Sequence, residues 1–197
     1  AESLEGETIS QLTAFAKQFE VAIVGSFICK DDECYYNRAF FITPQESYYY
    51  DKRHLFRMGG EAQSFSSGNE RVIVTYKQWH IMLLVCYDLR FPIWSRNRGC
   101  EYDLCIYVAN WPASRIHVWD ALLLARALEN QTYICGVNRV GIDGNGIPYN
   151  GHSKLIDARG EKLLQLPDEK TCVEVVVIDK EPLLHFREKF SVWMDAD

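Results

Sequence analysis

The sequence predicts a mixed α/β fold in a single domain spanning residues 1–197. Apolar strands alternate with amphipathic helices, and no Pro/Ser-rich linker, internal repeat or low-complexity stretch interrupts them. With 197 residues, 48% of them apolar, the chain can bury one substantial core. Several strands are apolar over their whole length, which is typical of a sheet covered by helices. We therefore expect layers of helix over sheet.

The first half of the chain predicts one helix followed by strands. Residues 7–19 carry Ile, Leu, Phe and Ala at helical spacing. A buried strand is predicted at 21–28, and the acidic turn at 31–33 leads into its hairpin partner at 35–42. Two more strands are predicted, at 71–76 and 81–85.

The second half predicts a long helix between two strands and then a strand series. The strands are 104–108 and 133–140, and apolar residues stripe a helix from about 117 to 130. A Gly-rich turn follows at 143–146. The remaining strands are predicted at 153–157, 163–164 and 172–178.

Cys86 lies where an apolar strand ends. Residues 81–85 are apolar, and the polar Tyr-Asp-Leu-Arg that follows, before 93–96, indicates a strand-to-helix elbow. A thiol at such an elbow faces a cleft, close to helical N–H groups that favour its thiolate form. The alternative is a buried packing cysteine, which is the commoner role for a cysteine considered alone.

Three further motifs surround this cysteine. Lys52 lies in Tyr-Asp-Lys-Arg-His-Leu-Phe at 50–56, Glu61 follows two glycines, and Cys86 opens Cys-Tyr-Asp-Leu-Arg-Phe-Pro. A second strand ends in Val-Ala-Asn-Trp-Pro at 108–112. In this order the motifs resemble the nitrilase superfamily of carbon–nitrogen hydrolases, in versions similar to its bacterial omega-amidase branch. The resemblance covers essentially the whole chain and implies a four-layer αββα sandwich.

The resemblance also implies a set of catalytic roles. Cys86 is the nucleophile, which splits amide hydrolysis into thioester formation and thioester hydrolysis. Lys52 and the backbone N–H of Tyr87 stabilise the oxyanion, and Glu61 holds the cluster in place. The alternatives are a solvated surface lysine at Lys52 and a mobile loop carboxylate at Glu61.

The general-base glutamate of the family has no match in this sequence. In relatives it ends an early strand before the helix that corresponds here to 7–19, and Glu2 and Glu5 lie too close to that helix to match. We therefore expect the base, with a first strand and a first helix, upstream of Ala1, and a C-terminus beyond Asp197. On this expectation residues 1–197 alone are inactive and poorly soluble.

Substrate choice depends on the residues around the elbow. Arg90 is suited to bind a substrate carboxylate through its guanidinium fork, or it forms a structural pair with an aspartate, Asp88 or Asp103. Asn110 and Trp111 end the next strand on the same rim, where ligands of α/β sheets bind. Trp111 is equally compatible with the pocket wall and with the core. The expected substrate is the ω-amide of a 2-oxo dicarboxylic acid, in preference to a nitrile.

Composition excludes several other classes of protein. A net charge of −6 and a pI near 5.4 argue against nucleic acid or anionic membrane as partners. Seven cysteines without a signal peptide indicate the cytoplasm. Cysteine pairs such as Cys29 and Cys34 lack zinc-ligand spacing, and we expect no metal or cofactor. The resemblance implies a homodimer, for which helix 117–130 together with the strand that follows it is the candidate interface. Arg126 and Glu129 on this helix are expected to form a structural or subunit-contact pair. A catalytically silent binding or assembly module of the same fold is the alternative function.

Overall fold

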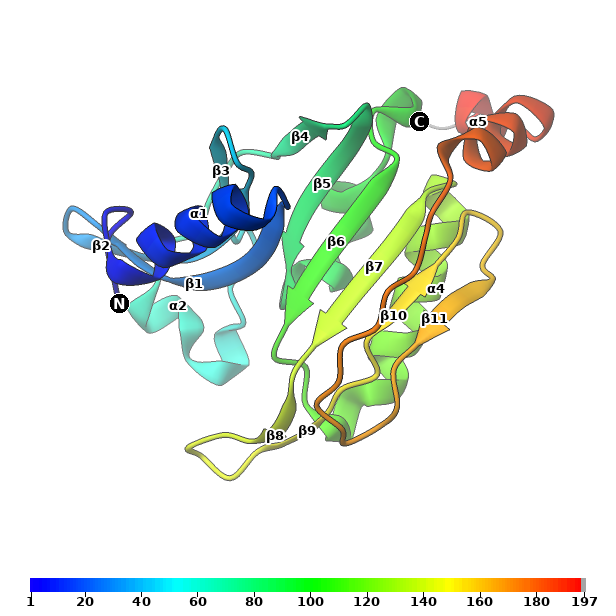
Figure 1. Ribbon diagram of the computed structural model, residues 1–197. Coiled ribbons are helices and arrows are strands. Elements are labelled where there is room, and N and C mark those ends of the chain that lie inside the picture. Colours follow the sequence, from blue (N-terminus) through cyan, green and yellow to red (C-terminus); the bar gives the residue numbers. More distant parts are fainter. Residues whose placement is uncertain (196–197) are drawn as a thin grey trace.

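The computed structural model describes residues 1–195 and contains two principal sheets (Figure 1). The smaller sheet is an antiparallel meander of β1 (Ile23–Asp31), β2 (Cys34–Ile42) and β3 (Ser47–Asp51). The turn between β1 and β2 falls at Asp32, which has a φ of +51°. This sheet ends immediately before Lys52, so the lysine lies at the edge of a rigid element.

The larger sheet has six strands in the order β11-β10-β7-β6-β5-β4. Its central strands β5, β6 and β7 are parallel, and the outer strands are antiparallel. The bounds are β4 Ile73–Tyr76, β5 Trp79–Val85, β6 Leu104–Ala109, β7 Tyr133–Asn138, β10 Lys154–Ile156 and β11 Lys162–Gln165. A separate hairpin of β8 (Val140–Ile142) and β9 (Pro148–Asn150) extends from the carboxyl end of β7 (Figure 1).

Helices cover the outer faces of the two sheets. The long helices are α1 (Glu7–Phe19) and α4 (Ile116–Asn130), and α5 (Lys180–Lys189) lies at the opposite end of the large sheet from the β8–β9 hairpin (Figure 1). Short helical turns complete the fold: η1 Arg57–Gly59, α2 Glu61–Ser64, η2 Cys86–Arg90, α3 Pro92–Ser95, η3 Arg98–Cys100, η4 Ala113–Arg115 and η5 Val192–Asp195. None of the helices within residues 1–195 combines the length and apolar character needed to cross a membrane.

Strand β2 shows how the layers stack. Phe40 and Ile42 pack with Ile9 and Ala16 of α1, whereas Ala39 and Phe41 belong to the core formed with the large sheet. Alternate side chains of a strand point to opposite faces, so one strand serves two layers. The order is therefore α1, small sheet, large sheet, α4, which is the expected four-layer arrangement.

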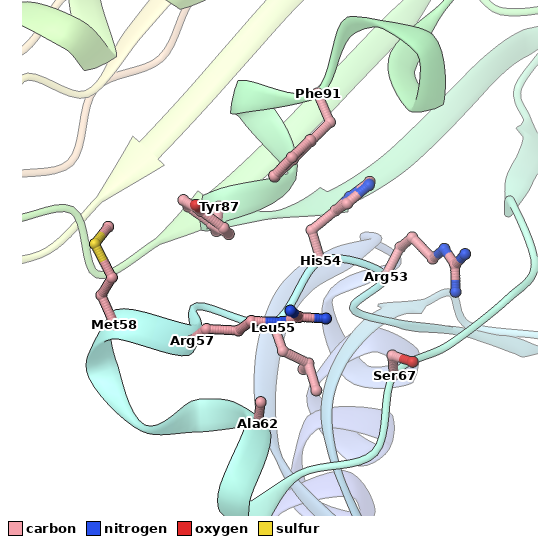
Figure 2. Close-up of a pocket in the computed structure, with 9 residues that line it drawn as sticks. All are labelled: Arg53, His54, Leu55, Arg57, Met58, Ala62, Ser67, Tyr87 and Phe91. Carbon is pink, nitrogen blue, oxygen red and sulfur yellow. The ribbon is translucent and has the colours of Figure 1, made fainter.

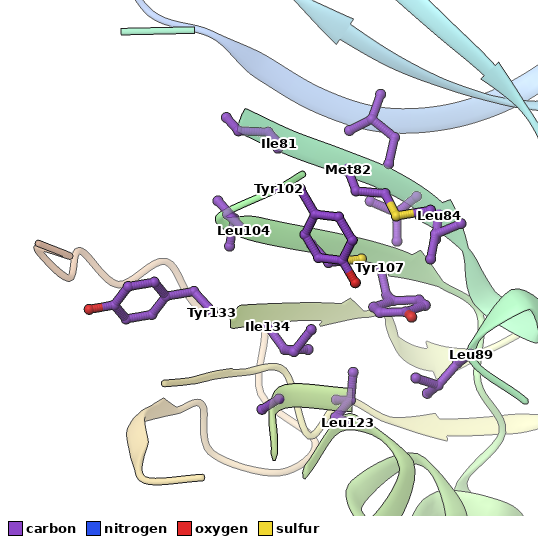
Figure 3. Packing of buried hydrophobic residues seen from close by; sticks show 14 of the residues in the cluster. Ile81, Met82, Leu84, Leu89, Tyr102, Leu104, Tyr107, Leu123, Tyr133 and Ile134 are labelled. Carbon is purple, nitrogen blue, oxygen red and sulfur yellow. The ribbon is translucent and has the colours of Figure 1, made fainter. Parts of the chain in front are cut away.

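The main core lies between the large sheet and its neighbours on both faces. Figure 3 shows Met82 and Leu84 of β5, Tyr107 of β6 and Ile134 of β7 packed together, all of them buried. On the α4 side the helix approaches β7 at Gly136, where an added Cβ would lie 2.5 Å from a methyl carbon of Leu123. This close approach requires glycine.

The segment 172–178 is not a strand, contrary to the prediction. It pairs with no strand in the described part of the chain, and Val173, Val175 and Val177 are about nine-tenths exposed, at 90%, 90% and 88%. Alternating valines favour an extended backbone, but a strand also needs a neighbour that accepts its hydrogen bonds. The predicted strand 133–140 also divides, at Arg139, into β7 and β8, and β3, β9 and α5 were not predicted.

Glu2 has a structural role at the start of α1. Its carboxylate accepts hydrogen bonds from the backbone N–H of Thr8 at 2.9 Å and from the Thr8 hydroxyl at 2.7 Å. These bonds lower the pKa of Glu2 below its usual value. A carboxylate near a helix N-terminus stabilises the helix, and Glu2 has this role for α1.

Candidate active site

The predicted site residues surround one cavity of about 690 Å³ at the carboxyl ends of β5 and β6. Its wall includes Cys86 from η2, Asn110 and Trp111 from the end of β6, and Lys52 and Glu61 from the segment after β3. The carboxyl edge of parallel strands is where open α/β sheets bind ligands. Of the residues predicted from the sequence, only the Tyr87 side chain faces elsewhere.

Cys86 occupies a strained backbone position at the end of β5. Its φ is +45°, a left-handed conformation that L-residues adopt infrequently. Strand β5 ends at Val85 and the turn η2 begins at Cys86, as the predicted elbow requires. The thiol lies 3.8 Å from the carbonyl oxygen of Asn110, to which it donates. Strain of this kind persists where surrounding contacts hold it, and it is concentrated at functional sites.

Lys52 and Glu61 form a buried ion pair at the cavity. The Lys52 Nζ lies 2.6 Å from Glu61 Oε2, which also accepts the backbone N–H of Phe56 at 2.6 Å. The other oxygen, Oε1, accepts from the Asn37 side-chain amide at 3.0 Å. Gly60 has a φ of +76° and turns the chain into α2, whose first residue is Glu61. Glu61 is therefore a fixed carboxylate rather than a mobile one, and Lys52 is buried rather than solvated.

Burial raises and Lys52 lowers the pKa of both Glu61 and Cys86, but burial outweighs Lys52 only at Cys86. Burial by itself raises the pKa of Glu61, but the charge and hydrogen bond of Lys52 outweigh it, and the pKa lies below its usual value. Burial raises the pKa of the Cys86 thiol, and the nearby Lys52 only partly offsets this. Among the charged groups near the thiol, Lys52 is the one that favours the thiolate, and a hydrogen bond with the Asn110 backbone acts in the same direction.

A second cavity, of about 420 Å³, adjoins the elbow (Figure 2). Figure 2 shows Tyr87 and Phe91 from the segment after β5 on its wall with His54, and Met58 on the opposite side. The Tyr87 ring packs edge-on against Phe91 at a centroid distance of 5.1 Å. Because this side chain faces away from the thiol, only the backbone N–H of Tyr87 is left for the predicted role at the oxyanion.

Arg90 is not engaged by either aspartate considered as its partner. Asp88 accepts from Tyr50 and His54, and Asp103 pairs with Lys180 and Arg187. The Arg90 guanidinium instead lies 5.4 Å from the Trp111 ring centroid, on the cavity wall. The expectation of an Arg–Asp structural pair is therefore wrong. Trp111 is both pocket wall and core, since it is 3% exposed and packs on Trp119.

The structure adds residues to the site that the sequence motifs did not identify as functional. Asn138 holds the Trp111 backbone on both sides, accepting its N–H at 2.7 Å and donating to its carbonyl at 3.0 Å. Arg115 and Arg139 add positive charge to the cavity wall. Asp88 lies buried beneath the elbow. Its position within the Cys-Tyr-Asp-Leu-Arg motif was the one signal in the sequence, but its partners are distant along the chain.

No metal centre accompanies these residues. Within residues 1–195 no group of three or more His, Cys, Asp or Glu side chains is arranged to hold a metal ion. All seven cysteines, each inside the described range, are free.

Comparison with known proteins places the chain in a family. The family model described as carbon–nitrogen hydrolase matches residues 1–183. Omega-amidase YafV of Escherichia coli is 45% identical, with the match covering 98% of this chain and 75% of the relative. The 2-oxoglutaramate amidase of Bacillus subtilis is 32% identical over 94% of this chain and 73% of its own.

Solved structures of proteins from the same family have a similar fold. A carbon–nitrogen hydrolase superfamily protein from Xanthomonas campestris, with an arsenic adduct in its active site, is 39% identical and superposes with a TM-score of 0.97 over 100% of this chain and 77% of that one. A variant amidase from Nesterenkonia sp., in which acrylamide has added to the active-site cysteine, is 25% identical with a TM-score of 0.78, covering 92% of this chain and 72% of its own.

The chain belongs to the carbon–nitrogen hydrolase family, and it is an amidohydrolase of the nitrilase superfamily. The resemblance to the bacterial omega-amidase branch and the predicted four-layer sandwich are both confirmed. Amide hydrolysis of a small substrate follows from this membership.

Proposed function

We propose that the protein is an omega-amidase, which hydrolyses the ω-amide of a 2-oxo dicarboxylic acid and releases ammonia through a thioester on Cys86. The observation that carries the proposal is the grouping of Cys86, the Lys52–Glu61 pair and Arg90 around one cavity. The names of the Escherichia coli and Bacillus subtilis relatives support the substrate class.

In the first half-reaction the thiolate of Cys86 attacks the amide carbon. The carbonyl oxygen becomes an oxyanion, which Lys52 and the backbone N–H of Tyr87 are positioned to stabilise in this scheme. The carbon–nitrogen bond breaks as the nitrogen accepts the proton that a general base has removed from the Cys86 thiol, and ammonia leaves. The acyl group remains on the sulfur as a thioester. Lys52 thus serves twice, since its charge also favours the thiolate.

In the second half-reaction water attacks the thioester. The carbon–sulfur bond breaks, the acid product leaves, and the thiol regains its proton. A base must activate this water, and Glu61 is poorly suited because its oxygens are occupied by Lys52, Phe56 and Asn37 and its pKa is lowered. We therefore assign Glu61 to holding Lys52 rather than to the role of base.

Arg90 supplies substrate selection in this proposal. Its guanidinium lies on the cavity wall over Trp111, with no carboxylate partner in residues 1–195 at ion-pair distance. A planar fork binds a carboxylate through two parallel hydrogen bonds. The distal carboxylate of a 2-oxo dicarboxylic ω-amide would fill this position while its amide reaches the thiol. Asn110 and Trp111 complete the wall.

The test is a comparison of substrates on the intact protein. We expect 2-oxoglutaramate or 2-oxosuccinamate to be hydrolysed with a higher kcat/KM than a neutral aliphatic amide of similar size, and ammonia release measures both. Equal values would remove the role of Arg90 and the dicarboxylic substrate class. No ammonia from any of these amides would favour the alternative of a binding or assembly module.

We further propose a cytoplasmic homodimer that associates through α4. Leu124 and Leu128 on this helix are 39% and 47% exposed. The Arg126–Glu129 ion pair, at 2.8 Å, is structural, because Arg126 also donates to the Leu89 carbonyl at 2.7 Å. The seven free thiols suit a reducing compartment. Light scattering of the intact protein should give the mass of a dimer, and replacement of both leucines by serine should lower it to that of a monomer.

A further inference from the structure

Asp88 is a buried carboxylate that joins the segment of the nucleophile to the segment of the lysine. Its side chain is 0% exposed, and its carboxylate accepts four hydrogen bonds. One oxygen accepts the Val85 N–H at 3.1 Å and the Tyr50 hydroxyl at 2.8 Å. The other accepts the backbone N–H of His54 at 2.9 Å and lies 2.8 Å from His54 Nδ1. No lysine or arginine in residues 1–195 lies within ion-pair distance of it.

These four donors come from the two segments that carry the chemistry. Val85 precedes the nucleophile, and Asp88 itself is two residues after it. Tyr50 and His54 are two residues before and two residues after Lys52. One carboxylate therefore ties the chain on both sides of Lys52 to the elbow that carries Cys86.

The Tyr50 hydroxyl can donate its hydrogen bond only to Asp88. Its oxygen already accepts the backbone N–H of Arg53 at 3.1 Å and the indole N–H of Trp94 at 3.0 Å. Its proton must therefore go to Asp88, the remaining acceptor. Burial and the neighbouring carboxylate raise the pKa of Tyr50 well above its usual value, so it keeps this proton.

The His54 ring is also fixed. It stacks on Phe91 with a centroid distance of 3.8 Å and an interplanar angle of 9°. Figure 2 shows the two side chains reaching toward each other from the facing segments. With the ring held in this way, Nδ1 directs its hydrogen to Asp88 Oδ1, and the segment after Lys52 has a single favoured position.

We propose that Asp88 is a positioning residue for the amide hydrolysis, which holds Lys52 at the Cys86 thiol through Tyr50 and His54. The inference rests on the proposed function, because it gives Lys52 and Cys86 the roles assigned there. An amide at this position would accept with one oxygen only, so two of the four donors would lose their acceptor. The expected consequence is a displaced Lys52 ammonium, with the substrate-binding Arg90 left in place.

The direct charge effect of Asp88 has the opposite sign. The titratable groups whose charges act on the thiol include Lys52, Glu61, Asp88 and Tyr149. The same cavity is also lined by Arg90, Arg115, Arg139 and Asp143. The negative charge of Asp88 raises the pKa of Cys86, and the positive charge of Lys52 lowers it. Removal of the Asp88 charge alone would thus ease thiolate formation, whereas displacement of Lys52 would hinder it. The direction of the change separates the two roles.

The experiment follows alkylation of Cys86 by iodoacetamide against pH in the intact protein. Peptide mass spectrometry isolates Cys86 from the exposed Cys34. We expect the pH midpoint to rise in Asp88→Asn and in Tyr50→Phe, which keeps the carboxylate. We also expect kcat to fall about 10- to 100-fold, the order seen when catalytic groups are misplaced by an ångström, with KM unchanged.

Asp103→Asn is the matched control, since it removes another buried aspartate with hydrogen-bonded partners. It should lower the melting temperature and leave the alkylation midpoint unchanged. A midpoint that falls or stays constant in both Asp88→Asn and Tyr50→Phe overturns the inference, even if Cys86 proves essential. If the midpoints rise but Cys86→Ala still releases ammonia, the positioning of Lys52 stands and the proposed function fails.

Discussion

Two buried aspartates lie at opposite ends of the central strands and have different partners. Asp103, before β6, pairs with Lys180 at 2.7 Å and Arg187 at 3.0 Å, and these residues belong to α5. Asp88, after β5, accepts only from a tyrosine, a histidine and backbone N–H groups. Burial raises the pKa of Asp103, but Lys180 and Arg187 outweigh it, and the pKa is lowered.

The difference indicates separate roles for two residues of the same type. Asp103 neutralises Lys180 and Arg187 and thereby holds α5 against the large sheet, so its role is to stabilise the fold. Asp88 leaves the buried Lys52 to Glu61 and the thiol. A cation held by Asp88 would compete for that position. In the proposed mechanism the Cys86 end of the sheet therefore places the Lys52 ammonium at the cavity, whereas at the other end Asp103 neutralises Lys180 and Arg187.

The largest expected effect on activity is the loss of the Cys86 thiol, compared with the loss of the Cys100 thiol at the opposite end of the sheet. Cys86→Ala should lower kcat for ammonia release by at least about 10⁴-fold, by analogy with removal of other catalytic nucleophiles. Cys100→Ala, close to the Asp103 cluster, should leave kcat within twofold. Steady-state ammonia assays on the two variants test this contrast, and comparable losses would break it.

Separate replacement of Lys52 and of Lys180 should distinguish an effect on activity from an effect on stability. Lys52→Met should lower kcat by about 10²-fold or more, the order for loss of one oxyanion donor. Lys180→Met should instead lower the melting temperature and leave kcat unchanged, since its partner is Asp103. Kinetics and thermal melts on both proteins give the comparison. A normal kcat in Lys52→Met would place the oxyanion elsewhere.

Substitution of the arginines tests specificity. Arg90→Lys should reduce the preference for a dicarboxylic ω-amide over a neutral amide by about 10-fold, because an ammonium cannot form the planar two-bond contact. Arg187→Lys should leave this ratio unchanged and weaken the contact with Asp103. The ratio of kcat/KM values for the two substrates is the measurement, and an unchanged ratio in Arg90→Lys would reassign that residue.

The smallest effect concerns acid stability. The pKa of Glu61 is lowered in the folded protein, so its charge contributes stability above the usual carboxyl pKa. This contribution is lost as the pH falls through the lowered value. Glu61→Gln should therefore lose less free energy of unfolding on acidification than the unaltered protein, as urea titrations at several pH values would measure. An equal loss would show that Lys52 does not favour the carboxylate.

Local patterns in the sequence predicted most of the fold. Helix 7–19 agrees with α1, and the strands around Cys86 were placed to within a few residues. The prediction of a strand at 172–178 was wrong because strand pairing depends on neighbours that are remote in the chain. Helix α5 was missed because only Leu183 and Arg187 are buried in it, and its anchor, Asp103, is distant in sequence.

The candidate site divides in the same way. Lys52, Glu61 and Cys86 were identified by family motifs, and the structure brings all three to one cavity. Asp88 was considered only as a partner for Arg90, because nothing local links it to Tyr50, 38 residues away. Hydrogen bonds that join distant segments are set by tertiary structure, and a motif of neighbouring residues does not contain them.

The central claim is that Cys86 carries the acyl group during turnover. Mass spectrometry of the intact protein, mixed with 2-oxoglutaramate and quenched in acid, tests it most directly. We expect an added mass equal to the amide minus ammonia, mapped to the peptide that contains Cys86 and lost as hydrolysis ends. An adduct on another residue, or ammonia release at the normal rate in Cys86→Ala, would contradict the account.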